Sequence, residues 1–146
     1  MMVRDVLARK GYRVISIDRD ATINEAIAKL VQNNIGSLPV LSHDGQLEGI
    51  FSERDVLRII HNRGENFGRL RISDVMTTNP VTCNCDDDVN YVMGQMGDCR
   101  IAKLPVLDGT QLVGIISVGD VVKVLHDHVS TENQHLISYI HGVVLS

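Results

Sequence analysis

The sequence predicts an α/β (α+β) fold made of two pseudo-symmetric β-α-β-β-α repeats that pack through their sheets, with an extra C-terminal helix. The first observation behind this is a duplicated string: Gly-Ile-Phe-Ser-Glu-Arg-Asp at 49–55 returns 65 residues later as Gly-Ile-Ile-Ser-Val-Gly-Asp at 114–120. The second is that strand-like and helix-like segments surround both copies in the same order. Two copies are too few for a solenoid, so two small lobes packed face to face are expected.

The duplication extends upstream, because Leu-Pro-Val at 38–40 recurs at 104–106, an offset of 66 residues. The one-residue difference falls in the turn at 42–45, where changes of length are well tolerated. These limits place the first repeat at 1–64, the second at 65–129 and a C-terminal helical extension at 130–146. Each half alone would have a marginal hydrophobic core, so the lobes should depend on each other and leave clefts between them.

In the first repeat, residues 3–8 predict a short helix and 14–17 a short strand. Thr22 and Glu25 form a capping box that opens a second helix. Strands are expected over 37–41 and 46–51, joined by a turn, and Ser52 should cap the next helix. The residues expected to face the core are Ile23, Ala26, Ile27, Leu30 and Val31 on one helix, and Val56, Leu57 and Ile60 on the other.

The second repeat predicts the same order after a linker over 62–71. A strand around 81–82 precedes a helix that starts after Asp86-Asp87-Asp88. Strands follow near 104–107 and 112–116, and a helix starts at Ser117. The residues expected to face the core of the first of these helices are Val89, Val92, Met93 and Met96. The extension carries Leu136, Ile137 and Ile140 on one face, which could cap the core or pair with another chain.

Charge and composition exclude several classes of protein. Residues 1–73 hold 11 Lys and Arg against 9 Asp and Glu, whereas residues 74–146 hold 3 against 9. A duplex-nucleic-acid binder would show a basic domain, so nucleic acid is an unlikely partner. No apolar run is long enough to span a bilayer and residues 1–5 do not resemble a secretory signal, so a cytoplasmic location without membrane contact is expected.

Cysteines and histidines give weak signals for a metal or redox site. Cys83, Cys85 and Cys99 are odd in number, and the spacing of the first two suits neither an ordinary disulfide nor a zinc site. Reduced structural thiols are the preferred interpretation. His126, His128 and His135 could suggest a metal, but His61 and His126 both fall at helix ends, where capping explains them better. The expectation is therefore no metal site.

The duplicated string offers a ligand three kinds of group. A helix start at Ser52 or Ser117 presents a hydroxyl, unpaired N–H groups and the positive end of the helix dipole, which suit a phosphate. The Asp three residues on would repel a phosphate, but its carboxylate can accept from the two hydroxyls of a ribose. The apolar Ile could flank a base. The alternative is that Ser-x-x-Asp only caps the helix, as most such strings do.

The duplicated motifs, with Leu-Pro-Val upstream of each and Asp-Val-Met at 74–76, resemble the cystathionine beta-synthase (CBS) domain family. Residues 3–128 are similar to a stand-alone tandem pair, or Bateman module, of the bacterial two-CBS type. This resemblance implies two clefts for adenosine-containing ligands such as AMP, ADP, ATP, NAD(H) or S-adenosylmethionine, and a homodimer formed through helices. It implies no catalytic cofactor.

The resemblance also implies which residues serve each cleft. Each site takes its ribose Asp and phosphate hydroxyl from one repeat and its base-binding backbone from the lead-in of the other. The first site would comprise Ile50, Ser52, Arg54, Asp55, Thr77, Asn79, Pro80, Val81, Ile101 and Ala102. The second would comprise Arg13, Val14, Ile35, Gly36, Lys103, Ile115, Ser117, Gly119 and Asp120.

The two sites should differ in their affinity for polyphosphates. Arg54 and Arg58 accompany the first motif, whereas the second has Gly119 in place of Arg54 and relies on Lys103, with Lys10 or Arg13 as further candidates. The first site is therefore expected to bind polyphosphates more tightly. The linker arginines Arg63, Arg69 and Arg71 are expected to be solvated.

The predicted function is that of a regulatory adenosine-nucleotide sensor and not an enzyme, since neither Ser52 nor Ser117 has a credible His partner. Ligand binding would shift the relative position of lobes or subunits, and an unknown partner protein would respond to the change. The alternative is a dimeric interaction module with vestigial clefts that regulates a partner without nucleotide. A third hypothesis, zinc or redox sensing through cysteines and histidines, is the least favoured.

Overall fold

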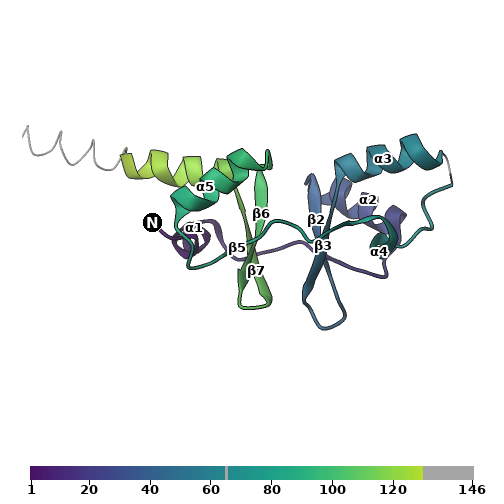
Figure 1. Cartoon of the computed structure of the whole chain (residues 1–146), viewed down its shortest axis with the longest axis horizontal. Helices are drawn as coiled ribbons and strands as arrows, with labels where there is room; N and C mark the ends of the chain where they lie inside the picture. Colours follow the sequence, from purple (N-terminus) through teal and green to yellow (C-terminus); the bar gives the residue numbers. More distant parts are fainter. Residues whose placement is uncertain (65, 130–146) are drawn as a thin grey trace, which may run out of the picture.

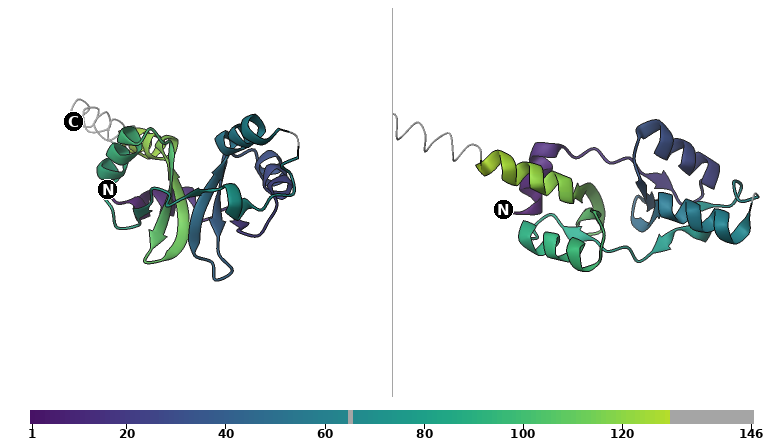
Figure 2. Two further views of the ribbon diagram at one scale, coloured as in Figure 1. Left: turned by 45° about the vertical axis from the view of Figure 1, so that its right-hand side comes forward. Right: turned by 90° about the horizontal axis from the view of Figure 1, so that it is seen from above.

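The structure is a computed structural model that describes residues 1–64 and 66–129, and in it two small sheets lie side by side with helices on their outer faces (Figures 1 and 2). The first sheet has the order β1-β2-β3-β4 and the second β5-β6-β7. An isolated bridge between Gln46 and Gln111 joins their edges. The predicted α/β fold of two repeats packed through their sheets is confirmed.

The elements follow the predicted order. The first half contains α1 (Val3–Lys10), β1 (Ile17–Asp18), α2 (Ile23–Asn33), β2 (Ser37–Leu41), β3 (Leu47–Ser52) and α3 (Glu53–Arg63). The second contains α4 (Ile72–Val75), β4 (Thr77–Thr78), β5 (Cys83–Asn84), α5 (Val89–Asp98), β6 (Lys103–Asp108), β7 (Gln111–Ser117) and a helix over 118–129. The predicted C-terminal extension, 130–146, lies outside the described residues.

The two central hairpins repeat each other in register. Pro39 lies opposite Ile50 and Val40 opposite Gly49, just as Pro105 lies opposite Ile115 and Val106 opposite Gly114. Both hairpins have a register shift directly after the Val. In each lobe the first strand pairs in parallel with the second, so the β-α-β unit and the hairpin form one mixed sheet.

The lobes exchange their lead-in segments. Helix α1 packs its buried residues Val3, Val6 and Leu7 into the core of the second repeat. Conversely, Ile72 of α4 belongs to the core of the first repeat, with Met76 packed against it. Each hydrophobic core therefore contains residues from both halves of the sequence, which ties the lobes together and brings a segment of one repeat beside the motif of the other.

Gly49 and Gly114 make this exchange possible. A Cβ added at Gly49 would lie 2.6 Å from the backbone oxygen of Thr77, and one at Gly114 would lie 2.9 Å from Cδ2 of Leu7. Real Cβ atoms do not approach so closely, so each lead-in segment passes over a glycine.

Helix capping was predicted well, and so was most of the inward face of α2, where Ile23, Ala26 and Leu30 are buried. Thr22 and Ser52 both form capping boxes and Asp88 caps α5, as expected. Val89, Val92 and Met96 are buried, and Met93 packs against them.

The prediction was wrong for Val31, Leu57 and Ile60, which are 74%, 68% and 47% exposed. On α3 the buried residues are instead Asp55 and Ile59, one turn apart. The polar Asp55 takes the inward position because its carboxylate is bonded at the helix start, and this turns Leu57 outward.

The short strands were displaced from their predicted places. Residues 14–16 are not part of any strand, and β1 starts at Ile17, while β5 starts at Cys83 rather than near Val81. The segments before both strands cross between lobes, so their apolar residues have no strand to pair with at those positions. The unpredicted β4 pairs Thr77 with Ile50 of β3.

The cysteines behave as structural thiols among the described residues. Cys83 and Cys85 are buried and Cys99 is exposed, and all three are unpaired. Burial, together with the nearby charges of Asp87 and Cys85, raises the pKa of Cys83 to about 12. A thiol held protonated in this way is a poor nucleophile and a poor metal ligand, which argues against a redox or metal role for Cys83.

Candidate functional site: the cleft beside Asp55

The first candidate site is built at the junction of β3 and α3. Ser52 ends the strand in extended conformation, and its hydroxyl accepts a hydrogen bond from the backbone N–H of Asp55 at 3.4 Å. In return the backbone N–H of Ser52 donates to Oδ2 of Asp55 at 2.9 Å. One carboxylate oxygen of Asp55 therefore caps the helix, as the structural alternative predicted.

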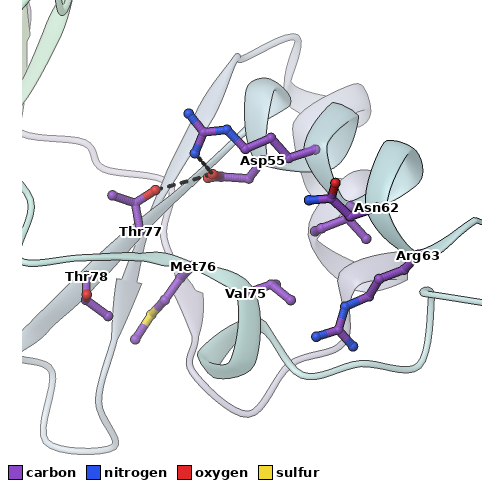
Figure 3. A pocket seen from close by; sticks show the side chains of 9 residues that line it. Asp55, Asn62, Arg63, Val75, Met76, Thr77 and Thr78 are labelled. Carbon is purple, nitrogen blue, oxygen red and sulfur yellow. Dashed lines mark hydrogen bonds and ion pairs between the residues drawn. The ribbon is translucent and has the colours of Figure 1, made fainter.

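The other carboxylate oxygen of Asp55 faces the exchanged lead-in segment. The hydroxyl of Thr77 donates to Oδ1 at 3.2 Å, and Nη1 of Arg58 lies 3.8 Å from the same atom (Figure 3). Asp55 is only 5% exposed, whereas Thr77 and Arg58 are exposed. A 3.2 Å bond is long for two oxygens, so this hydroxyl is a partner that a ligand hydroxyl could replace at low cost.

Beside Asp55 lies an open pocket of about 470 Å³. One wall is the face of α3, and the other is the lead-in segment of the second repeat, α4 and β4 (Figure 3). The lining residues are Asp55, Arg58, Ile59, Asn62, Arg63, Val75, Met76, Thr77 and Thr78. The pocket thus offers a carboxylate, hydroxyls, an amide, two guanidinium groups and an apolar floor.

Sequence reasoning found only part of this pocket. Of the predicted first-site residues, Asp55 and Thr77 line it, and Ile50 lies directly opposite Thr77 in the sheet. Arg63 is exposed, as expected, and it also lines the pocket together with Asn62. Residues 55, 58, 59, 62 and 63 follow helical spacing, which was the signal available in the sequence.

The remaining predicted residues of the first site lie in several places. Arg54 is exposed on α3, and Asn79 adopts a left-handed conformation with φ 51° just before Pro80 and Val81. Ile101 packs against the core of the second repeat.

Gly36 and Ala102 each bond to the helix start of their own repeat. The carbonyl of Ala102 accepts from the N–H of Val118, and the carbonyl of Gly36 accepts from the N–H of Glu53. Gly36 and Ala102 thus each contact the motif of their own repeat. They also occupy N–H groups that were expected to be unpaired and available to a phosphate, so that expectation is wrong for Glu53 and Val118.

The second candidate site repeats the capping geometry with a different partner for its Asp. The backbone N–H of Ser117 donates to Oδ2 of Asp120 at 2.9 Å, and the N–H of Asp120 donates to the Ser117 hydroxyl at 3.0 Å. Nζ of Lys10 donates to the same Oδ2 at 2.6 Å and to the carbonyl of Ile115 at 2.7 Å. The two sites therefore differ: an ammonium group shares the capping oxygen of Asp120, whereas a hydroxyl bonds the other oxygen of Asp55.

These contacts shift the titration of Asp120. Burial raises the pKa of its carboxyl group, but the hydrogen bonds from Lys10 and Ser117 outweigh burial and leave the pKa below its ordinary value. Asp120 is thus held ionised by a charged partner from the other half of the sequence.

The other predicted residues of the second site lie in several places. Lys103 lies opposite Ser117 in the sheet and is exposed, as are Arg13 and Gly119. Val14 is half-buried. Ile35 lines a separate apolar groove of about 500 Å³ between α2 and α3, together with Val31 and Leu57.

Within residues 1–64 and 66–129, Asp18, Asp20 and His43 bring three possible metal-ligand atoms within 4.8 Å of one another. Both ring nitrogens of the exposed His43 already contact these carboxylates, at 3.2 Å and 2.7 Å. His135 lies outside the described residues.

No helix within residues 1–64 and 66–129 has the length and apolar character needed to cross a membrane.

Comparison with known proteins agrees with this architecture. The sequence model of the CBS domain matches residues 3–62 and 72–127. A curated relative, the CBS domain-containing protein CBSX3, mitochondrial, of Arabidopsis thaliana, is 34% identical over 96% of this chain and 72% of its own length.

Two solved structures are similar over most of their length. A CBS-domain containing protein from Agrobacterium tumefaciens superposes with a TM-score of 0.78 at 36% identity, covering 85% of this chain and 98% of the other. The CBS domain pair of protein MJ0100, solved with 5'-methylthioadenosine and S-adenosyl-L-methionine, superposes with a TM-score of 0.74 at 26% identity, covering 88% and 98%. With two matched domains and this shared fold, the chain belongs to the CBS domain family, as a tandem pair.

Proposed function

We propose that this chain is a regulatory CBS pair that binds an adenosine-containing ligand, AMP, ADP, ATP, NAD(H) or S-adenosylmethionine, in the cleft beside Asp55. The observation that carries the proposal is the pocket of about 470 Å³ in which a buried carboxylate faces a hydroxyl and two arginines lie on the same wall. The complex of protein MJ0100 with two adenosine-derived ligands supports this ligand class.

In the proposed complex the ribose takes the place of the Thr77 hydroxyl. A ribose hydroxyl donates to Oδ1 of Asp55 while Oδ2 continues to cap α3, so binding does not uncap the helix. The phosphate lies toward Arg58 and Arg63, because the N–H groups of Glu53 and Asp55 are already satisfied within the protein. Guanidinium groups bind phosphate oxygens through paired hydrogen bonds. The cleft beside Asp120 is a second, weaker site for polyphosphates.

The proposed action is regulatory and non-catalytic. The pocket walls belong to α3 of one repeat and the lead-in of the other, so a ligand that contacts both walls favours one arrangement of the lobes. The shift is limited by the difference in affinity of the ligand for the two arrangements. A partner protein would respond to that shift.

A homodimer through the helices is part of the proposal. Val31, Leu57 and Ile60 expose apolar side chains on α2 and α3, and Tyr91, Val122, Leu125 and Val129 do so in the second lobe. Apolar side chains gathered on the outer helices are typical of an interaction surface. The occupant we propose is a second copy of the chain.

A dimeric interaction module without ligand is the second candidate function. It is favoured by one observation, namely that both Asp55 and Asp120 already have partners within the protein. Thermal-shift screening with adenosine, AMP, ADP, ATP, NAD⁺, NADH and S-adenosylmethionine separates the two. A nucleotide at about 100 times its Kd should stabilise the fold by about 2.7 kcal/mol and raise the Tm. Flat curves for every ligand would favour the interaction module.

A further inference from the structure

Lys10, the last residue of α1, is bonded to the motif of the second repeat. Its ammonium group donates to the carbonyl of Ile115 and to Oδ2 of Asp120, two residues 105 and 110 positions away. These are the two residues that the duplicated motif predicts to flank the base and to hold the ribose at the second site. The corresponding carboxylate of the first site is bonded to a neutral hydroxyl, that of Thr77.

The two partners differ in how readily a ligand could replace them. The bond between Lys10 and Asp120 is short and charge-assisted, and the two side chains are only 35% and 22% exposed. Such bonds are about twice as strong as bonds between neutral groups. A sugar hydroxyl can substitute for the Thr77 hydroxyl with little loss. In the second repeat the ammonium bridges Ile115 and Asp120, so a ligand that contacts both must displace it, and a hydroxyl cannot compensate Asp120 for its loss. An uncharged nucleoside is therefore at a disadvantage in the second cleft.

A lysine has a long flexible stem with a compact charge, so an ammonium group displaced from Asp120 can move to a nearby anion. We propose that Lys10 is the selectivity residue of the second cleft: it occupies the ribose position until a ligand arrives whose anionic group can take over the ammonium. The inference rests on the proposed function. It predicts that this cleft admits adenosine ligands with a phosphate and rejects adenosine itself.

The test is a titration of the full chain followed by amide resonances, which report each cleft separately. The amides of Gly119 and Asp120 report the second cleft, and those of Arg54 and Asp55 report the first. Adenosine and AMP are compared in the unmodified chain and in Lys10→Met, Lys10→Arg and Arg9→Met. Arg9 is exposed, so its variant removes a cation from α1 without removing the ion pair.

In the unmodified chain, AMP should bind the second cleft at least about tenfold more tightly than adenosine, since a charge-assisted hydrogen bond is at stake. Lys10→Met should strengthen the binding of adenosine and bring the affinities for AMP and adenosine to within about threefold of each other. Lys10→Arg and Arg9→Met should keep the preference for AMP. At the first cleft, the ratio of the affinities for AMP and adenosine should be the same in the unmodified chain and in all three variants.

If Lys10→Met kept the preference of the second cleft for AMP over adenosine, the role of Lys10 would be overturned while nucleotide binding stayed established. Amide shifts confined to the first cleft would have the same consequence. If neither ligand moved any of the four amides, the proposed function would fail and this inference with it.

Discussion

At the scale of single residues, the two motif carboxylates share a backbone geometry but have different partners. Asp55 and Asp120 both cap their helices through Oδ2, yet one also faces the hydroxyl of Thr77 and the other the ammonium of Lys10. Both partners come from the opposite half of the chain. The capping interpretation and the ligand interpretation therefore do not exclude each other, because capping by Oδ2 leaves Oδ1 of Asp55 directed at the pocket.

Arg58→Gln should weaken the binding of phosphate-bearing ligands in the first cleft. It removes a guanidinium that lines the pocket while leaving the cap intact, so ATP affinity should fall about tenfold and adenosine affinity should change little. Calorimetry with both ligands measures this. Arg69→Gln, an exposed arginine outside the pocket lining, is the matched control. Equal losses for ATP and adenosine would contradict a phosphate role.

The ion pair of Lys10 and Asp120 should make stability depend on pH. The folded pKa of Asp120 is depressed, so its contribution is present above the unfolded value of about 3.8 and is lost as pH falls through the folded value. Urea unfolding should show Lys10→Met less stable than the unmodified chain near neutral pH, with the gap closing in acid. A gap that is independent of pH would contradict the linkage.

At the scale of elements, the lead-in exchange depends on two glycines with different neighbours. Gly49→Ala should destabilise the fold by about 1–3 kcal/mol, because the added Cβ meets the backbone oxygen of Thr77, which cannot rotate away. Gly114→Ala should cost less, since the Cβ meets only the flexible end of Leu7. Urea denaturation measures both changes.

Gly94→Ala in α5 serves as the control for that pair. No atom lies within 4 Å of the added Cβ, so the change should stabilise the helix by up to about 1 kcal/mol. If Gly114→Ala lowered the stability of the fold more than Gly49→Ala, the contact with the backbone oxygen of Thr77 would not explain the cost.

How far each element could be predicted depends on how local its cause is. The starts of α2, α3 and α5 follow from side chains three residues or fewer from the amides that they cap, at Thr22, Ser52 and Asp88, and these were predicted. The apolar pattern of α3 did not show its inward face, because the polar Asp55 is buried and the apolar Leu57 is exposed, so Leu57 was misassigned.

The candidate site shows the same limit more strongly. Its motif residues repeat in the sequence, and one of the two motifs, that of Asp55, borders a pocket in the structure. The membership of Arg63 and Asn62 in the pocket arises where α3 packs beside α4, and the pairing of Lys10 with Asp120 spans 110 residues. Only the folded arrangement brings these groups together.

At the scale of the whole molecule, the exposed apolar helices should hold two chains together. Leu57→Asp should convert a dimer to a monomer, because it places a charge on a side chain that is 68% exposed here and would be buried between copies. Light scattering after gel filtration gives the mass. Tyr12→Ser removes a comparably exposed apolar side chain away from these helices and should leave the dimer intact. A monomeric unmodified chain would contradict the proposed assembly.

Calorimetric titration of the full chain with AMP, ATP and NAD⁺, repeated on Asp55→Ala, tests the central claim most directly. The account predicts saturable binding of at least one of these nucleotides to the unmodified chain and a loss of about tenfold or more in Asp55→Ala at the first cleft. Circular dichroism confirms that the variant folds. Absence of binding to the unmodified chain, or equal binding to both proteins, would contradict the assignment of the Asp55 cleft as a nucleotide site.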